Sequence, residues 1–293
     1  MTKILSLIAN PKSPVIDESV LERIREWFPK AEIRALSKGI AYDVELEDAD
    51  GDTFLGAQHA SQGRPIDVNL IDADHRRKRL LIADMDSTMI RQECIDELAE
   101  FAGRRAEISA ITERAMRGEL NFEAALKERV AMLKGLPVSV LQDAFDQRIT
   151  LTPGAETLVK TMNAAGAVTA LVSGGFTFFT ERVGAACGFQ SAQANALLME
   201  NGALTGGVAT PILGRAAKQN ALLRLVGEKN IDLADTLAVG DGANDLSMLE
   251  RAGLGVAFHA KPAVAEAAHA RIDHGDLTAL LYLQGIPQAE FAH

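Results

Sequence analysis

Four short clusters along the chain combine acidic, basic and hydroxyl side chains with glycines. The first is Asp84-Met85-Asp86-Ser87-Thr88, which directly follows the apolar run 80–83. Two carboxylates at i and i+2 after a buried strand need a cation or a proton, because Asp is rarely buried without a partner. The structural alternative is a helix N-cap, which would need only one Asp.

The second and third clusters supply groups that could bind an anion. Ser173-Gly174-Gly175 follows the apolar run 168–172, where a hydroxyl and glycine N–H groups can form an anion nest, although an ordinary tight turn explains the same residues. Lys218 lies in a helical stretch and would usually be solvated. Placed near the other clusters, its point charge could neutralise a phosphoryl oxygen.

The fourth cluster is Gly240-Asp241-Gly242-Ala243-Asn244-Asp245, after the apolar run 236–239. Its glycines allow a sharp turn, and Asp241 and Asp245 add two carboxylates. Carboxylates from two strand ends, with water, form the hard-oxygen environment that Mg²⁺ accepts. A loop with capping Asp and Asn residues would explain one acid but not the whole cluster.

The elements that must position these clusters follow an α/β pattern. Apolar runs at 80–83, 168–172, 236–239 and 254–258 have the texture of buried parallel strands, and helices through about Cys187 and from about Asn244 alternate with them. The pattern predicts a doubly wound parallel sheet, with the clusters at the carboxyl ends of its strands. A helical block at 91–147 interrupts it after the first strand.

The first 75 or so residues predict a separate α+β unit, in which one helix packs on an antiparallel sheet. The expected strands lie near 3–9, 33–35, 42–46 and 66–70. The expected helix has Ser13 as N-cap and Pro14 at N1, ends at Pro29, and buries Val20, Leu21, Ile24, Trp27 and Phe28.

A basic run, His75-Arg76-Arg77-Lys78-Arg79, marks the boundary between this unit and the rest. It divides the chain into domains 1–76 and 77–293. The run could be a nucleic-acid patch, but it is short and the chain is acidic, which favours a solvated linker. Removal of residues 1–75 is therefore expected to leave a folded, active domain.

The composition of the chain limits which binding partners and which cellular compartment are expected. The net charge of −10 disfavours nucleic acid and anionic membranes. Two cysteines at unrelated positions indicate neither a disulfide framework nor a zinc site, and fit a reducing compartment. No run approaches 18 apolar residues and the N-terminus lacks the pattern of a signal peptide, so the expected location is the cytoplasm.

Taken together and in this order, the four clusters resemble the haloacid dehalogenase superfamily of aspartate-nucleophile phosphotransferases, over about residues 80–285. Within it, the chain is similar to the phosphoserine phosphatases in three segments: DMDSTMIRQECIDELA at 84–99, RAMRGELNFEAALKERV at 114–130 and GDGANDLSML at 240–249. The resemblance implies the superfamily's α/β core with a helical cap at about 88–150. The N-terminal unit is similar in outline to a regulatory ACT domain.

The resemblance also implies roles for individual residues. Asp84 would be the nucleophile that forms an aspartyl phosphate, and Asp86 the general acid and base. Mg²⁺ would bind Asp84, the backbone carbonyl of Asp86, and Asp241, with Asp245 nearby. The residues that would contact the phosphoryl group are Ser173, Gly174, Lys218 and Asn244.

In the cap, the resemblance places Glu93 against a substrate ammonium and Arg129 against its carboxylate, where a guanidinium gives a bidentate contact. Met116 and Phe122 would form apolar walls. Taken alone, Arg129 would be interpreted as a surface charge and Glu93 as an acid at a helix N-terminus.

The implied activity is hydrolysis of O-phospho-L-serine to L-serine and phosphate, the last step of L-serine biosynthesis. Three alternatives remain open: transfer of the phosphoryl group to an alcohol such as homoserine, hydrolysis of another small phosphomonoester, and a regulatory amino-acid-binding protein with a vestigial catalytic domain. The sequence also leaves a homodimer open.

Overall fold

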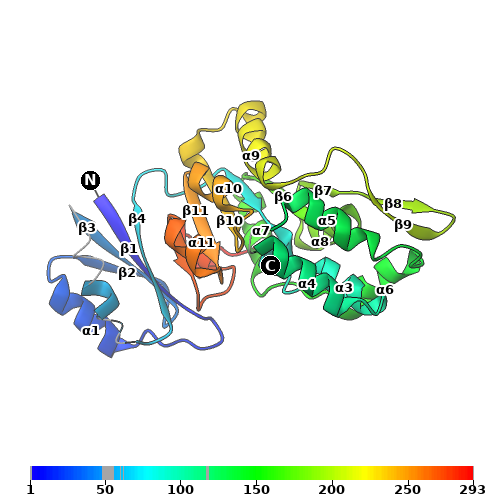
Figure 1. Ribbon diagram of the computed structural model, residues 1–293. Coiled ribbons are helices and arrows are strands. Elements are labelled where there is room, and N and C mark those ends of the chain that lie inside the picture. Colours follow the sequence, from blue (N-terminus) through cyan, green and yellow to red (C-terminus); the bar gives the residue numbers. More distant parts are fainter. Residues whose placement is uncertain (1, 48–55, 60, 62, 117–118, 293) are drawn as a thin grey trace.

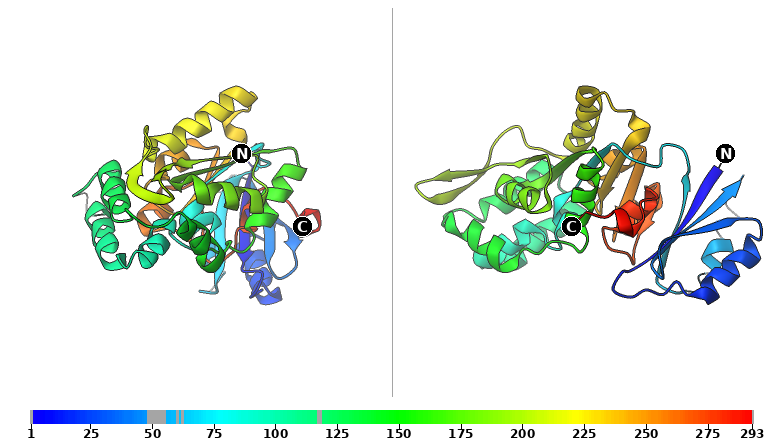
Figure 2. Two further views of the ribbon diagram at one scale, coloured as in Figure 1. Left: turned by 90° about the vertical axis from the view of Figure 1, so that its right-hand side faces the viewer. Right: turned by 180° about the vertical axis from the view of Figure 1, so that it is seen from behind.

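The computed structural model describes residues 2–47, 56–59, 61, 63–116 and 119–292. Three parts follow one another in space (Figures 1 and 2): an N-terminal domain, a domain built on a parallel sheet, and a helical cap at the far end. None of the described helices is both long and apolar enough to span a membrane.

The N-terminal domain is a four-stranded antiparallel sheet with strand order β2-β3-β1-β4 and a helix on one face. Central β1 pairs with β3 on one side and β4 on the other, which is the ferredoxin-like arrangement. This confirms the expected α+β unit. Its elements are β1 (Thr2–Ala9), α1 (Glu18–Trp27), β2 (Glu32–Ser37), β3 (Ala41–Glu47) and β4 (Ile66–Asp72).

Two expectations for the first helix are wrong. Its N-cap is Asp17 rather than Ser13, because the Asp17 carboxylate accepts the Val20 N–H and so satisfies a free donor of the first turn. Trp27 is 54% exposed instead of buried. It is the last residue of α1, and its ring lies against Gly56, where an added Cβ would come within 2.8 Å of it.

The central domain contains six parallel strands in the order β12-β11-β10-β5-β6-β7, which confirms the doubly wound sheet. The first strand in sequence, β5, lies between β10 and β6, so the strand order reverses beside it and opens a crevice at the carboxyl ends. These strands are β5 (Leu80–Ala83), β6 (Val168–Phe176), β7 (Ser191–Asn195), β10 (Thr236–Gly240), β11 (Leu254–Phe258) and β12 (Ala270–Ile272).

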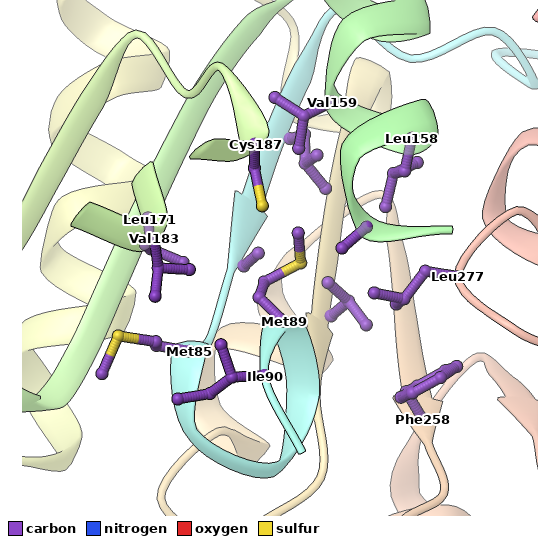
Figure 3. Close-up of a cluster of buried hydrophobic side chains, with 14 of the residues drawn as sticks. Met85, Met89, Ile90, Leu158, Val159, Leu171, Val183, Cys187, Phe258 and Leu277 are labelled. Atoms are coloured by element: carbon purple, nitrogen blue, oxygen red, sulfur yellow. The ribbon is translucent and has the colours of Figure 1, made fainter. Parts of the chain in front are cut away.

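Both faces of this sheet are buried, as the apolar texture of β5 predicts. Leu81 and Ala83 belong to a cluster with α7 and α8, whereas Leu80 and Ile82 face α9, α10 and α11. Figure 3 shows part of the first cluster, in which Met85 and Met89 lie among side chains of α7 and α8. The helices are α7 (Ala155–Ala164), α8 (Thr177–Cys187), α9 (Arg215–Lys229), α10 (Leu246–Arg251) and α11 (Pro262–Ala267).

The chain between β5 and α7 forms a cap of four helices, in agreement with the interruption expected near 88–150. Its two connections to the core run side by side: Ile90 and Leu151 form an antiparallel bridge, and the Thr152 N–H donates to the Met89 carbonyl. The helices are α3 (Cys94–Phe101), α4 (Arg105–Met116), α5 (Phe122–Ala131) and α6 (Ser139–Arg148).

A hairpin that the sequence pattern does not predict also packs on the cap. It consists of β8 (Leu197–Glu200) and β9 (Ala203–Val208). Leu204 exchanges backbone hydrogen bonds with the cap, accepting from the Gly135 N–H at 2.8 Å and donating to the Leu136 carbonyl at 2.8 Å. The cap is therefore held to the core by this hairpin as well as by its own two connections (Figure 2).

The basic run is not simply a solvated linker, because Arg76 joins the two domains. Its guanidinium makes a bidentate pair with the buried carboxylate of Asp43, at 2.7 Å to each oxygen, and donates to the Leu283 carbonyl of α12 (Ala279–Leu283). Nearby, the buried Asp67 carboxylate accepts the N–H groups of Asp273 and Gly275 at 2.8 and 2.7 Å. These partners lie far apart in the sequence, so the sequence pattern does not predict them.

We expect a chain without residues 1–75 to be less stable than the full chain. The apolar side chains of the N-terminal domain that share a cluster with α12 would be lost, and α12 would face water. Thermal unfolding should show a lower Tm for the truncated chain, while its folded fraction keeps its activity because every catalytic cluster lies beyond residue 76.

The Arg76→Ala variant of the full chain is the matched control for this truncation. It leaves the Asp43 carboxylate buried and unpaired, which costs roughly 3 kcal/mol, but it exposes no apolar face. An unchanged Tm in the truncated chain would show that the junction contributes nothing to stability.

Candidate active site

The carboxyl end of β5 places Asp84 in direct contact with Lys218. The distance from Lys218 Nζ to Asp84 Oδ1 is 2.7 Å, and both side chains are buried. The Asp84 N–H donates to the Val239 carbonyl of β10, which fixes the backbone beside the neighbouring strand. Lys218, which the sequence alone would place on a solvated helix surface, is therefore a buried counter-charge for the carboxylates of the site.

Asp245 is the second carboxylate on Lys218, at 2.5 Å from Nζ. Its other oxygen accepts the Gly242 N–H, so its orientation is fixed from both sides. A side chain at position 240 would have its Cβ 2.4 Å from the Asp245 carboxyl carbon, which explains the glycine there. Burial lowers the pKa of Lys218, but the charges of Asp245 and Asp84 outweigh it and raise the pKa overall.

Asp241 completes a group that can bind a metal ion. Carboxylate oxygens of Asp84, Asp241 and Asp245 lie within 4.8 Å of one another. Three carboxylates and one ammonium leave two negative charges when all are ionised. Burial and the Asp245 charge raise the pKa of Asp241 to about 6, and the same causes raise the pKa of Asp84 well above its usual value. These oxygen donors and this uncompensated charge fit Mg²⁺.

Asp86 lies in the turn η1 (Met85–Met89) that follows Asp84. Burial, and then the charge of Glu93, raise the pKa of Asp86 to about 8, against hydrogen bonds that it accepts from the Cys94 thiol and N–H. Its Oδ1 is buried and has no hydrogen-bond partner in the described part of the chain. A carboxyl group in this state is protonated near neutral pH and is suited to donate a proton.

Ser173, Gly174 and Gly175 form the next part of the site, but inside a strand rather than in a turn after it. They form a bulge within β6: Val172 pairs with Gln193 and Phe176 with Asn195, so three residues face one. The Ser173 hydroxyl accepts the Gly175 N–H at 2.9 Å. A Cβ on Gly175 would approach Asp86 Oδ2 to 3.0 Å, which places this bulge against the acidic pair.

The cap brings Glu93 and Arg129 toward the same centre. Glu93 is the N-cap residue of α3 and its carboxylate accepts the Ser87 hydroxyl at 2.6 Å. Arg129 is half-buried in α5, and burial lowers its pKa, although the charges of Asp96, Glu93 and Asp86 oppose that effect. Among the described residues its guanidinium donates to the neutral oxygens of Ala125 and Thr112 and has no carboxylate partner within 4.0 Å.

The remaining predicted residues occupy different positions around this centre. The Phe122 ring lies over Gly174 and Gly214, where a Cβ on either glycine would come within 3.1 and 3.3 Å of it. Asn244 is half-buried and packs against Gly242. Met116 ends α4, but its side chain lies outside the described residues, so its expected contact with a substrate stays a prediction.

Two residues to which the sequence analysis assigns no role make contacts near Asp84 and Asp86. The Thr88 hydroxyl donates to Asp241 Oδ1 at 3.2 Å and links the ends of β5 and β10. Cys94 donates to Asp86, as described above. Thr88 could have been noticed as part of the first cluster, but nothing in the sequence distinguishes Cys94 from an ordinary buried cysteine.

Comparison with known proteins agrees with this geometry. Residues 81–250 match the family model of the haloacid dehalogenase-like hydrolases. A phosphoserine phosphatase of Streptomyces coelicolor is 44% identical over 81% of this chain and 58% of its own length, and one of a Polaromonas species is 43% identical over 76% and 97%. The chain therefore spans less than two thirds of some relatives that it matches.

A solved structure also resembles the whole molecule. A haloacid dehalogenase-family hydrolase from Salmonella enterica serovar Typhi superposes with a TM-score of 0.86 and 34% identity, over 96% of this chain and 98% of the other. The likeness thus includes the N-terminal domain as well as the core and the cap. The chain belongs to the haloacid dehalogenase-like hydrolase family, within which it groups with the phosphoserine phosphatases.

Proposed function

We propose that the chain hydrolyses O-phospho-L-serine to L-serine and inorganic phosphate through an aspartyl phosphate on Asp84. The names of its relatives support the substrate, and the arrangement of charged groups supports the chemistry. The observation that carries the proposal is the pairing of two unlike carboxyl groups after β5: Asp84 in contact with a buried ammonium, and Asp86 free to hold a proton.

In the first half of the reaction an Asp84 carboxylate oxygen attacks phosphorus, and the bond from phosphorus to the serine oxygen breaks. The departing oxygen takes the proton of Asp86, whose raised pKa of about 8 keeps that proton available at neutral pH. Lys218 and the donors of the Ser173–Gly175 bulge stabilise the charge on the phosphoryl oxygens.

In the second half Asp86, now ionised, removes a proton from a water molecule that attacks the phosphorus of the aspartyl phosphate. The bond to Asp84 breaks, phosphate leaves, and both carboxyl groups return to their starting states. The nucleophile thus divides one difficult hydrolysis into two easier steps that are joined by a covalent intermediate.

We infer that Asp84, Asp241 and the backbone carbonyl of Asp86 hold Mg²⁺. When bound, the ion supplies the positive charge that lets a carboxylate approach a phosphate dianion. Asp245 is better explained as the residue that positions Lys218, because one of its oxygens is on Nζ and the other accepts the Gly242 N–H.

Substrate choice would come from the cap. Among the described residues the half-buried guanidinium of Arg129 has no carboxylate partner, which is costly unless a ligand supplies one. The carboxylate of phosphoserine provides a bidentate match for it. Glu93 lies close enough to Asp86 for its charge to raise the pKa of that residue, and it would bind the ammonium of the substrate. Phe122, whose ring lies over Gly174 and Gly214, would cover the end of the site that binds the phosphoryl group.

The Arg129→Ala variant is expected to lose roughly ten- to two-hundred-fold in kcat/KM for phosphoserine, since a charge-assisted contact contributes about 1.5–3 kcal/mol. An aryl phosphate, which lacks the carboxylate, should lose far less. Both values are to be measured on one folded preparation. Arg114→Ala is the matched control, because Arg114 is a cap arginine that pairs with the carboxylate of Glu128.

Equal losses on both substrates would mean that Arg129 supports the cap rather than substrate choice. Product analysis with and without homoserine would separate hydrolysis from phosphoryl transfer, since hydrolysis releases serine and phosphate in equal amounts whatever alcohol is added. We place this reaction last in L-serine biosynthesis and in the cytoplasm; both cysteines are free and buried, which fits a reducing compartment.

A further inference from the structure

Asn195, at the end of β7, is a buried side chain beside the Ser173–Gly175 bulge that the reaction described above does not use. It is 2% exposed. The bulge leaves the Gly174 carbonyl without a partner in the strand ladder, and Asn195 Nδ2 donates to that carbonyl at 2.9 Å. The side chain thus replaces the hydrogen bond that the irregular strand gives up.

The same side chain also holds the segment that begins α9. Its Oδ1 accepts the Leu213 N–H at 2.7 Å and its Nδ2 donates to the Leu213 carbonyl at 3.3 Å. Leu213 precedes Gly214, the N-cap of the helix that carries Lys218. Both amide hydrogens and one acceptor position of Asn195 are therefore used to join two segments that lie far apart in sequence.

We propose that Asn195 is a positioning residue for the phosphoryl group, because it fixes the Ser173–Gly175 bulge relative to the helix of Lys218. The inference deepens the proposed function and depends on a phosphate being bound between these two segments. Asn195 acts through Gly174 and Leu213 and does not itself touch the substrate.

Asn195 could instead serve only to fill space in the fold. The two roles predict different effects for different substitutions of Asn195. If Asn195 only fills space, then Asn195→Ala should be worse than the isosteric Asn195→Asp. If alignment matters, then Asn195→Asp should be at least as damaging, because a carboxylate would replace the donor that faces the carbonyls of Gly174 and Leu213.

Asn69 provides a matched control at the domain junction, away from the site. It is also buried and also joins two remote segments, donating to the Arg271 carbonyl at 3.0 Å and accepting the Arg271 N–H at 2.8 Å. Asn69→Asp should therefore lower Tm by a similar mechanism without affecting phosphate binding.

The experiment uses the full chain with Mg²⁺ and measures Tm, kcat/KM for phosphoserine and the inhibition constant of inorganic phosphate. We expect Asn195→Asp to raise that inhibition constant about ten-fold and to lower kcat/KM by about ten- to a hundred-fold, as small misplacements of binding groups do. Asn69→Asp should leave both constants unchanged.

Unchanged constants in Asn195→Asp, together with a Tm loss like that of Asn69→Asp, would overturn the proposal. If that variant does not fold, Asn195→Ser is judged by the same two constants, since its short hydroxyl cannot reach both segments. If the unmodified chain neither binds phosphate nor hydrolyses any phosphate monoester, the proposed function itself is wrong and this inference fails with it.

Discussion

Asp84→Asn is expected to lower kcat by at least about 10⁴-fold, the scale on which loss of a catalytic nucleophile acts. The amide keeps the size and hydrogen-bonding shape of the side chain but cannot attack phosphorus to form an aspartyl phosphate. Phosphate release from L-phosphoserine under saturating substrate measures the effect. Near-normal turnover would contradict a covalent intermediate on Asp84.

The same substitution should not weaken the fold. Burial and the Asp245 charge raise the pKa of Asp84, which means that the folded state disfavours its ionised form. A neutral amide removes this cost, so the Tm of the metal-free variant near neutral pH should equal or exceed that of the unmodified chain. Asp235→Asn is a useful control, because Asp235 pairs with His75 outside the site.

Chelation of divalent ions is expected to abolish turnover, and added Mg²⁺ should restore it. The carboxylate oxygens gathered within 4.8 Å around Asp84 repel a phosphate dianion unless a cation offsets them. Ca²⁺ should inhibit rather than restore, because its longer bonds and higher coordination number would displace the nucleophile. Full activity in a chelated, metal-analysed sample would refute the requirement.

Stability provides a second readout of the same metal site, through its dependence on pH. The pKa of Asp241 is raised to about 6 and that of Asp86 to about 8, so between 3.8 and about 8 these two carboxyl groups bind more protons in the folded chain than in the unfolded chain. The contribution of these two groups to metal-free stability should therefore fall as pH rises through this window. Mg²⁺ should raise Tm most at the upper end, and an equal effect at both ends would be inconsistent with these pKa values.

Much of the site follows from local sequence because each cluster comes directly after an apolar strand. The runs 80–83 and 236–239 predict β5 and β10 closely, and parallel pairing of the two strands brings Asp84 and Asp241 together. The parallel sheet confirms the α/β fold, and the match to the family model confirms the haloacid dehalogenase family. The assigned roles of single residues, such as proton transfer by Asp86, stay predictions.

Other features depend on contacts between remote segments, which a pattern of neighbouring residues does not encode. The hairpin β8–β9 includes the consecutive residues Leu198 and Met199, 45% and 46% exposed, so it lacks the alternation that marks a half-buried strand. The strand β12 has only three residues. Asn195 is another example: a polar residue in a polar stretch becomes informative only when Gly174 and Leu213 are placed beside it.

The junction around Arg76 limits how freely the two domains can be exchanged between proteins. A chimaera joined just before Arg76 would keep the arginine but would receive its partner from another protein. Unless the donor domain supplies carboxylates at the positions of Asp43 and Asp67, the graft leaves the half-buried guanidinium of Arg76 and the N–H groups of Asp273 and Gly275 unpaired. Recombination at this boundary is therefore expected to preserve stability only with donor domains that carry the matching acids, although the folds of the two domains are distinct.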